Sequence, residues 1–107
     1  MSASGGLTLT LVSNATAYNL LALIQAVTGY ANTHPTVREL TLVGGLGNAA
    51  AVIYVGGADV STSNFGVSLI ANQSTTYRSG LNDISMAEKW LVSGGNDVDV
   101  NVSWLIY

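Results

Sequence analysis

Cysteine is absent from the 107-residue sequence, which excludes disulfide bonds and thiolate metal sites. Charge is also scarce: charged residues make up 8% of the chain, against about 25% in an ordinary soluble domain. Only Arg38, Arg78 and Lys89 are basic, and they are scattered. Because a nucleic-acid surface neutralises phosphates with clustered Lys and Arg, the sequence excludes nucleic acid as a partner.

Long apolar runs are missing too. The longest, Leu20 to Val27, is interrupted by Gln25 and falls short of the ~20 residues that span a bilayer. No basic residue precedes the apolar residues of the N-terminus, so we expect no secretory signal and no membrane partner. Residues 1–6 are small and polar and predict a flexible tail, and residues 7–107 predict a single domain.

What is present is a largely apolar and neutral chain. Hydrophobic residues make up 49% of it, and the net charge is −3. With so few charged side chains, electrostatic repulsion protects an isolated monomer only weakly against association. Two interpretations are open: the surface is a neutral coat of Ser, Thr and Asn, or copies of the chain or a partner cover much of it.

One helix is expected near the N-terminus, after a strand. Residues 7–11 alternate with period two, as in a half-buried strand. Ser13 or Asn14 is suited to cap a helix over about residues 15–28, and Gly29 and Pro35 would end it. The apolar face of this helix would consist of Leu20, Leu21, Ile24 and Val27.

The rest of the chain predicts strands and turns. We expect strands over residues 37–43, 51–55, 67–71, 75–79, 89–93 and 98–106. Residues 98–106 alternate most regularly, which places Trp104 in the core. Glycine-punctuated strands at this spacing predict a mainly β fold, either an antiparallel β-sandwich or a jelly-roll-like barrel. The N-terminal helix would lie across an open end or an edge.

A glycine fingerprint at Gly45-Leu46-Gly47-Asn48-Ala49-Ala50 follows an apolar run, as in dinucleotide-binding folds. Such a turn binds a cofactor only when a helix follows it. Here the strand-forming residues 52–55 follow, and Gly56 ends them. We therefore interpret the glycines as a turn between strands and expect no cofactor.

Catalytic and metal-binding candidates are few. The single histidine, His34, precedes a proline in a connecting loop and has no nucleophile motif to serve. Asp97, Asp99 and Asn101 copy the first half of an EF-hand loop, but the glycine and the final glutamate are missing. On a strand the two aspartates would share one face and be solvated. We expect no metal site and no enzyme.

Aromatic residues offer contact sites. Tyr30, Phe65 and Tyr107 lie at loops or at the terminus, and Trp90 is suited either to the core or to an interface. We predict Tyr30, Phe65, Trp90 and Tyr107 as interface residues. A sugar-stacking platform, as in carbohydrate-binding β-sandwiches, stays an alternative.

The segment from Asn48 to Ala71, followed by DISMAEKWLV and a valine-alternating last strand, resembles small β-rich virion proteins of tailed bacteriophages. The similar features are Asn48-Ala49, Tyr54-Val55-Gly56, Val60-Ser61, Asn64, Gly66 and Leu69. The resemblance extends over about two-thirds of the chain, residues 37–106. One departure concerns a turn, since Ala71-Asn72 stands where an Ala-Gly turn is expected.

This resemblance implies a non-enzymatic structural protein that decorates or cements the phage head, made in the host cytoplasm and not secreted. Its partners would be the major capsid protein or another virion protein and copies of itself, in a homotrimer that occupies three-fold sites. Copies would bridge neighbouring capsid subunits. The alternatives are a tail, neck or baseplate component, or a carbohydrate-binding β-sandwich used in host adhesion.

Overall fold

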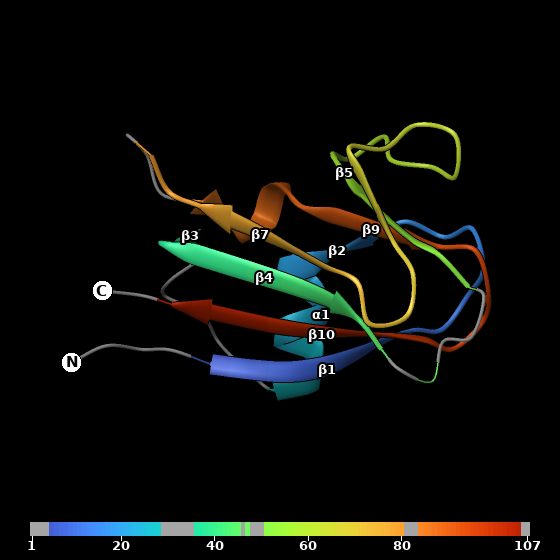
Figure 1. The fold of residues 1–107 in the computed structure, drawn as a ribbon, viewed down its shortest axis with the longest axis horizontal. Coiled ribbons are helices and arrows are strands. Elements are labelled where there is room, and N and C mark those ends of the chain that lie inside the picture. Colours follow the sequence, from blue (N-terminus) through green and yellow to red (C-terminus); the bar gives the residue numbers. More distant parts are fainter. Residues whose placement is uncertain (1–4, 29–35, 46, 48–50, 81–83, 106–107) are drawn as a thin grey trace.

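A computed structural model describes residues 5–28, 36–45, 47, 51–80 and 84–105. Over these ranges the chain is mainly β, with two four-stranded antiparallel sheets and one α-helix (Figure 1). The elements are β1 (Gly5–Leu11), β2 (Tyr18–Asn19), α1 (Leu20–Thr28), β3 (Thr36–Val37), β4 (Glu39–Gly44), β5 (Ile53–Gly56), β6 (Val67–Leu69), β7 (Ser74–Arg78), β8 (Ile84–Ser85), the 3₁₀ turn η2 (Met86–Glu88), β9 (Trp90–Ser93) and β10 (Val98–Leu105). The predicted fold class, a mainly β antiparallel fold compatible with a β-sandwich, is confirmed.

The strands pair in a nested order. β1 pairs with β10, β2 with β9, β3 with β8, β4 with β7 and β5 with β6, always antiparallel. The chain is therefore one long hairpin whose bend is the β5–β6 loop. Two further pairings, β10 with β4 and β9 with β5, fold this hairpin into the first sheet, β1-β10-β4-β7, and the second sheet, β2-β9-β5-β6.

The core lies between the sheets and follows the period-two patterns. In β4 every second residue is buried, so Leu40 and Leu42 face inward. In β10 the valines are buried, while Trp104 is half-buried and packs against the core. The fully buried large side chains include Leu9, Leu11, Leu20, Ile24, Leu40, Leu42, Ile53, Met86 and Leu91.

The helix begins later than predicted. Ala15 has a φ of 58°, a left-handed conformation that cannot start a right-handed helix, and its N–H donates to the Ser93 carbonyl at 3.0 Å. Tyr18 and Asn19 then pair with β9. The cap is Asn19, whose Oδ1 accepts the N–H of Ala22 at 3.1 Å. The prediction of Ser13 or Asn14 was wrong because pairing with a distant strand prevails over local helix propensity.

The apolar helix face is confirmed where side chains are described. Leu20 and Ile24 are fully buried, and Leu21 is half-buried. The side chain of Val27, together with Gly29 and Pro35, lies outside the described residues.

The strand before the helix, β1, begins at Gly5, two residues before the expected start. Gly5 and Gly6 therefore belong to a strand and not to the tail.

The predicted strand over residues 37–43 is divided. Val37 pairs with Ile84 in the separate β3–β8 ladder, and β4 starts only at Glu39. Between them the N–H of Arg38 donates to the Leu105 carbonyl at 2.8 Å. Sequence alternation does not show such a division, because it depends on which partner each residue meets.

The unusual Ala71-Asn72 turn connects β6 to β7. Asn72 has a φ of 65°, a left-handed conformation that asparagine tolerates better than most residues. Its N–H donates to the Gly44 carbonyl at 2.8 Å, and the N–H of Gln73 donates to the Ile70 carbonyl at 3.0 Å. Asn72 thus adopts the left-handed conformation that glycine would adopt in the expected turn. In the strand register that follows, Ser74 pairs with Val43.

Candidate functional site

Of the four predicted interface residues, the structure describes two. Phe65 is 44% exposed and lies in the β5–β6 loop, which is consistent with a contact role. Trp90 is half-buried at the start of β9, opposite Asn19 on one side and Gly56 on the other. Tyr30 and Tyr107 lie outside the described residues. Phe65 and Trp90 thus lie in or beside the second sheet, and the interface role of all four residues remains a prediction.

The β5–β6 loop is well structured. The N–H of Val60 donates to the Gly57 carbonyl at 3.0 Å, and Ser61 and Asn64 form an isolated β-bridge. The Asn64 side chain donates to the Asp59 carbonyl at 3.2 Å. Val60 itself is buried and packs over Gly56, where a Cβ would come within 3.0 Å of the valine. These contacts give the loop a defined shape.

The loop holds Phe65 against the second sheet. The ring of Phe65 lies on that of Tyr54 in β5, with ring centroids 4.7 Å apart and an interplanar angle of 53°. This tilted arrangement is a favourable one for aromatic pairs. An exposed aromatic ring that is already fixed in place loses little freedom on binding, so it is suited to anchor a contact.

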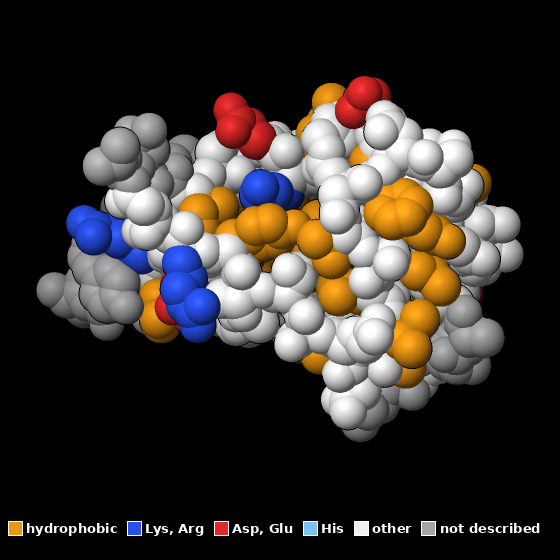
Figure 2. All heavy atoms as spheres, turned by 45° about the horizontal axis from the view of Figure 1, so that its top comes forward, with side chains coloured by type: hydrophobic (Ala, Val, Ile, Leu, Met, Phe, Trp, Pro, Cys, Tyr) orange, Lys and Arg blue, Asp and Glu red, His pale blue; other side chains and the backbone are white. Residues whose placement is uncertain are grey.

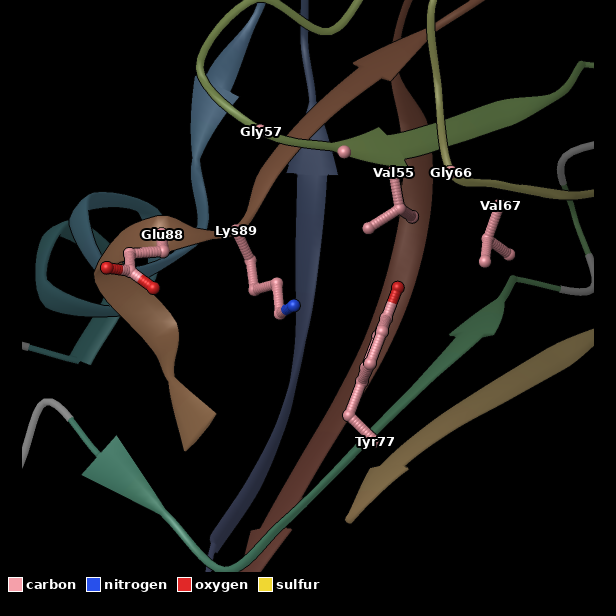
Figure 3. A pocket seen from close by; sticks show the side chains of 8 residues that line it. Val55, Gly57, Gly66, Val67, Tyr77, Glu88 and Lys89 are labelled. Atoms are coloured by element: carbon pink, nitrogen blue, oxygen red, sulfur yellow. The ribbon is translucent and has the colours of Figure 1, made fainter. Parts of the chain in front are cut away.

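A second feature is a cleft of about 380 Å³ between the open edges of the two sheets. Val55 and Val67 from the second sheet and Tyr77 from the first line its apolar part, and Lys89 and Glu88 lie at its rim. The ammonium of Lys89 lies 4.3 Å from the centre of the Tyr77 ring. Figure 3 shows the Lys89 amine pointing toward Tyr77 and the Glu88 carboxylate pointing away from it.

Burial shapes the chemistry of this cleft. It raises the pKa of the Tyr77 phenol above its ordinary value of 10.0, because the charged phenolate is poorly solvated there. The cleft therefore presents a neutral phenol beside an ammonium group. Such a site can take an apolar group with a polar end. Neither Tyr77 nor Lys89 is among the predicted interface residues, and their pairing could not be predicted, since strands far apart in sequence bring them together.

The outer face of the first sheet is polar but nearly uncharged. Thr8 donates to the Asn101 side chain at 2.6 Å, and Thr10 donates to Asp99 at 2.8 Å. The hydroxyls of Thr41 and Thr76 lie 3.1 Å apart on neighbouring strands. Cross-strand pairs of this kind give a polar face on which side chains hydrogen-bond to one another.

The aspartates predicted to share a strand face do not do so. Asp97 lies in the turn before β10 with a φ of 53°, and only Asp99 is on the strand. Within the described ranges, no three His, Cys, Asp or Glu side chains lie close enough together to hold a metal ion. His34 lies outside those ranges. After the second glycine of the fingerprint, Gly47, the next described element is the strand β5, as predicted.

Charged and hydrophobic side chains are unevenly distributed over one face of the molecule. Figure 2 shows hydrophobic side chains in patches across this face, with Lys and Arg side chains beside them at the left and in the middle and Asp and Glu side chains along the upper margin. Among the residues whose burial the structure describes, the large hydrophobic ones that are exposed are Val12, Phe65 and Ile70. No helix in the described part of the chain is long and apolar enough to cross a membrane.

Comparison of the chain with family models, with curated proteins and with solved structures found no match in any of the three. Its function is therefore inferred from geometry and residue chemistry.

Proposed function

We propose that the protein is a non-enzymatic structural component of a tailed-bacteriophage virion, a decoration or cement protein that binds the head as a homo-oligomer. The observation that carries this proposal is the ordered β5–β6 loop, which presents the exposed ring of Phe65 packed on Tyr54. Val60, Ser61 and Asn64, on which the phage resemblance partly rests, are the residues that shape this loop.

The fold supports the same proposal. The ten strands pair in nested order, eight of them in two four-stranded sheets and β3 with β8 in a two-stranded one, and this pairing is compatible with a jelly roll, a chain rolled up as one long hairpin. Viral capsid domains commonly have this architecture, but so do lectins and cupins. The fold is therefore supporting and not decisive, because one fold serves many functions.

The protein would stabilise the head by cross-bridging capsid subunits. Each copy binds across neighbouring capsid subunits, so that local opening of the shell must break several interfaces at once. Interfaces of about 1,600 Å² become strong when a central aromatic anchor fills a pocket on the partner. With 8% charged residues, binding depends mainly on apolar burial, which salt screens little.

Co-sedimentation with empty heads of the phage that encodes the chain tests this role. We expect the protein to pellet with the heads at low and at high salt, and Phe65→Ser to weaken binding at least tenfold. Ser68→Ala, which changes an exposed residue on the neighbouring strand, is the matched control and should bind normally. Absence of binding, or binding that salt abolishes, would overturn the proposal. Binding to tails, necks or baseplates instead would favour that location.

The cleft supports a second candidate, a carbohydrate-binding β-sandwich. Its volume of about 380 Å³ lies within the range of small-ligand sites, and it contains an aromatic ring beside a cation. Calcium-independent binding on a glycan array that is lost in Tyr77→Ala or Trp90→Ala would favour this candidate over the first.

A further inference from the structure

The four edges of the two four-stranded sheets are protected to very different degrees. β2 has two residues and β6 has three, so each offers little backbone for pairing. β7 carries Arg78, whose Nε lies 3.5 Å from the Glu39 carboxylate. β1 has seven residues, Gly5–Leu11, with no charge and no proline. Since short strands, charge and proline are the usual protections against edge pairing, β1 is the unprotected edge.

Only one side of β1 is paired. All seven of its residues lie opposite β10. Within the described residues, no other strand pairs with β1, and no backbone hydrogen bond reaches its outer side. In an antiparallel strand the backbone N–H and C=O groups alternate between the two sides, so the outer side offers a row of donors and acceptors. The ligand that fits such a row is another extended strand.

We propose that β1 pairs antiparallel with β1 of a second copy, around a two-fold axis through Thr8, the middle residue of the strand. The two first sheets then form one continuous eight-stranded sheet. In this register Thr8 faces Thr8, Leu7 faces Leu9, and Gly6 faces Thr10. A shift by one residue would set leucines opposite threonines and turn one inner face outward, so the alternation excludes it. A shift by two residues would leave two residues of each strand unpaired, whereas the axis through Thr8 pairs the full length of Gly5–Leu11.

The side chains of β1 suit a copy of themselves. Leu9 and Leu11 point into the core, while Thr8 and Thr10 are exposed on the outer face. Threonines directly opposite one another form favourable cross-strand pairs. The nearest acid, Asp99, lies opposite Thr10 near the end of the strand, so the two copies of Asp99 stay apart.

The helix beside this edge is equally free of charge. α1 contacts β1, and in Figure 1 it lies behind β10 and β1 and extends below β1. It contains no charged residue, and Ala22, Gln25 and Ala26 are exposed on it. The proposed two-fold axis would bring two such helices toward each other behind the joined sheets. Small uncharged side chains allow this approach without burying a charge.

This contact goes beyond the proposed virion role and does not depend on it, because the isolated protein can test it. It also differs from the three-fold symmetry that the phage resemblance implies. The mass of the oligomer therefore distinguishes the two.

Thr8→Cys gives the direct test. The chain has no cysteine, so any disulfide must join residue 8 of two copies. Facing residues of an antiparallel pair have Cβ atoms about 4.5–5.5 Å apart, close to the spacing a disulfide needs. We expect mild oxidation to convert most of the protein to a covalent dimer. Thr76→Cys, exposed on the same sheet face but on the opposite edge strand β7, should show only background cross-linking.

The second test places charges at the proposed two-fold axis and measures association by size-exclusion chromatography with light scattering. Thr8→Lys and Thr8→Glu each put two like charges face to face, so each should raise the dimer dissociation constant at least tenfold. Mixing the two variants should restore association as a heterodimer. Thr76→Lys should leave the dimer unchanged. Circular dichroism identifies any variant that fails to fold, in which case the cross-linking of Thr8→Cys against Thr76→Cys decides the question.

Three results would overturn the two-fold contact: a monomeric wild-type protein, cross-linking no greater at residue 8 than at residue 76, or a trimer whose mass Thr8→Lys does not change. The last of these would leave the decoration role in place. A dimer that dissociates in Thr8→Lys but does not bind phage heads would support the contact and overturn the virion role instead.

Discussion

At the scale of single residues, close backbone approaches determine which positions tolerate change. Gly44, at the end of β4, lies directly beneath the turn between β6 and β7, and a Cβ there would overlap the Ile70 carbonyl. The N–H of Gly44 donates to the Gln73 carbonyl at 2.8 Å and holds the same turn. Because both neighbours are backbone, they cannot rotate away as a side chain can.

We therefore predict that Gly44→Ala lowers the free energy of unfolding by about 3 kcal/mol, as overpacking in a tight site does. Gly80→Ala is the control, since a Cβ at Gly80 meets no atom within 4 Å. Urea unfolding followed by fluorescence measures both. Equal stability of the two variants would contradict the close approach at Gly44.

Tyr77 makes stability depend on pH in the alkaline range. Burial raises the pKa of its phenol in the folded state above the ordinary value of 10.0. Ionisation is therefore easier in the unfolded chain, and the native state loses stability as the pH rises above about 10. We predict that the free energy of unfolding falls less in Tyr77→Phe than in the wild type between about pH 9 and pH 11. Parallel pH profiles for the two proteins would contradict it.

At the scale of elements, local signals placed the helix approximately but not its start. Its apolar face was readable from three- and four-residue spacing, and Leu20 and Ile24 are buried as expected. The first residues of the predicted helix instead join a strand, because Tyr18 and Asn19 meet β9. Asn19 then serves two elements: its Oδ1 caps α1, and its Nδ2 donates to the Ala87 carbonyl in η2 at 2.7 Å.

Replacing Asn19 should show both roles separately. We predict that Asn19→Ala lowers the free energy of unfolding by about 1–2 kcal/mol, while Asn19→Asp, which keeps the capping oxygen, costs less. Asn14→Ala removes the residue that the sequence suggested as a cap and should change stability by less than about 0.5 kcal/mol. Thermal and urea unfolding measure all three, and an Asn14 effect as large as that of Asn19 would contradict the assignment.

At the scale of the whole molecule, the nested hairpin brings the first and the last strand, β1 and β10, side by side in one sheet. β10 is paired on both sides, with β1 and β4, and β4 is paired with β10 and β7. The fold therefore depends on contacts between residues far apart in sequence. The fold is stabilised as a unit, and the short edge strands contribute little to its free energy of unfolding.

Native-state hydrogen exchange should show this gradient. We predict that amides in β10 and β4 exchange most slowly, close to the rate set by global unfolding, and that amides in β6 exchange at least about tenfold faster. Amides on the outer side of β1 should become slower as the protein concentration rises, if two copies pair there. Uniform exchange across all strands would contradict the gradient.

The sequence by itself determined the local pattern: the mainly β class, most of the strands, the apolar face of α1 and the inward-facing residues of β4 and β10. Those features depend on side-chain periodicity, which can be recognised within a short stretch of sequence. The tertiary structure alone decided the nested strand order, the division of β3 from β4, the start of α1, the cleft at Tyr77 and Lys89 and the unprotected edge of β1. Each of these depends on which distant segments meet, and the free energy of that choice comes from burial and backbone pairing across the whole chain, which a local window of sequence does not contain.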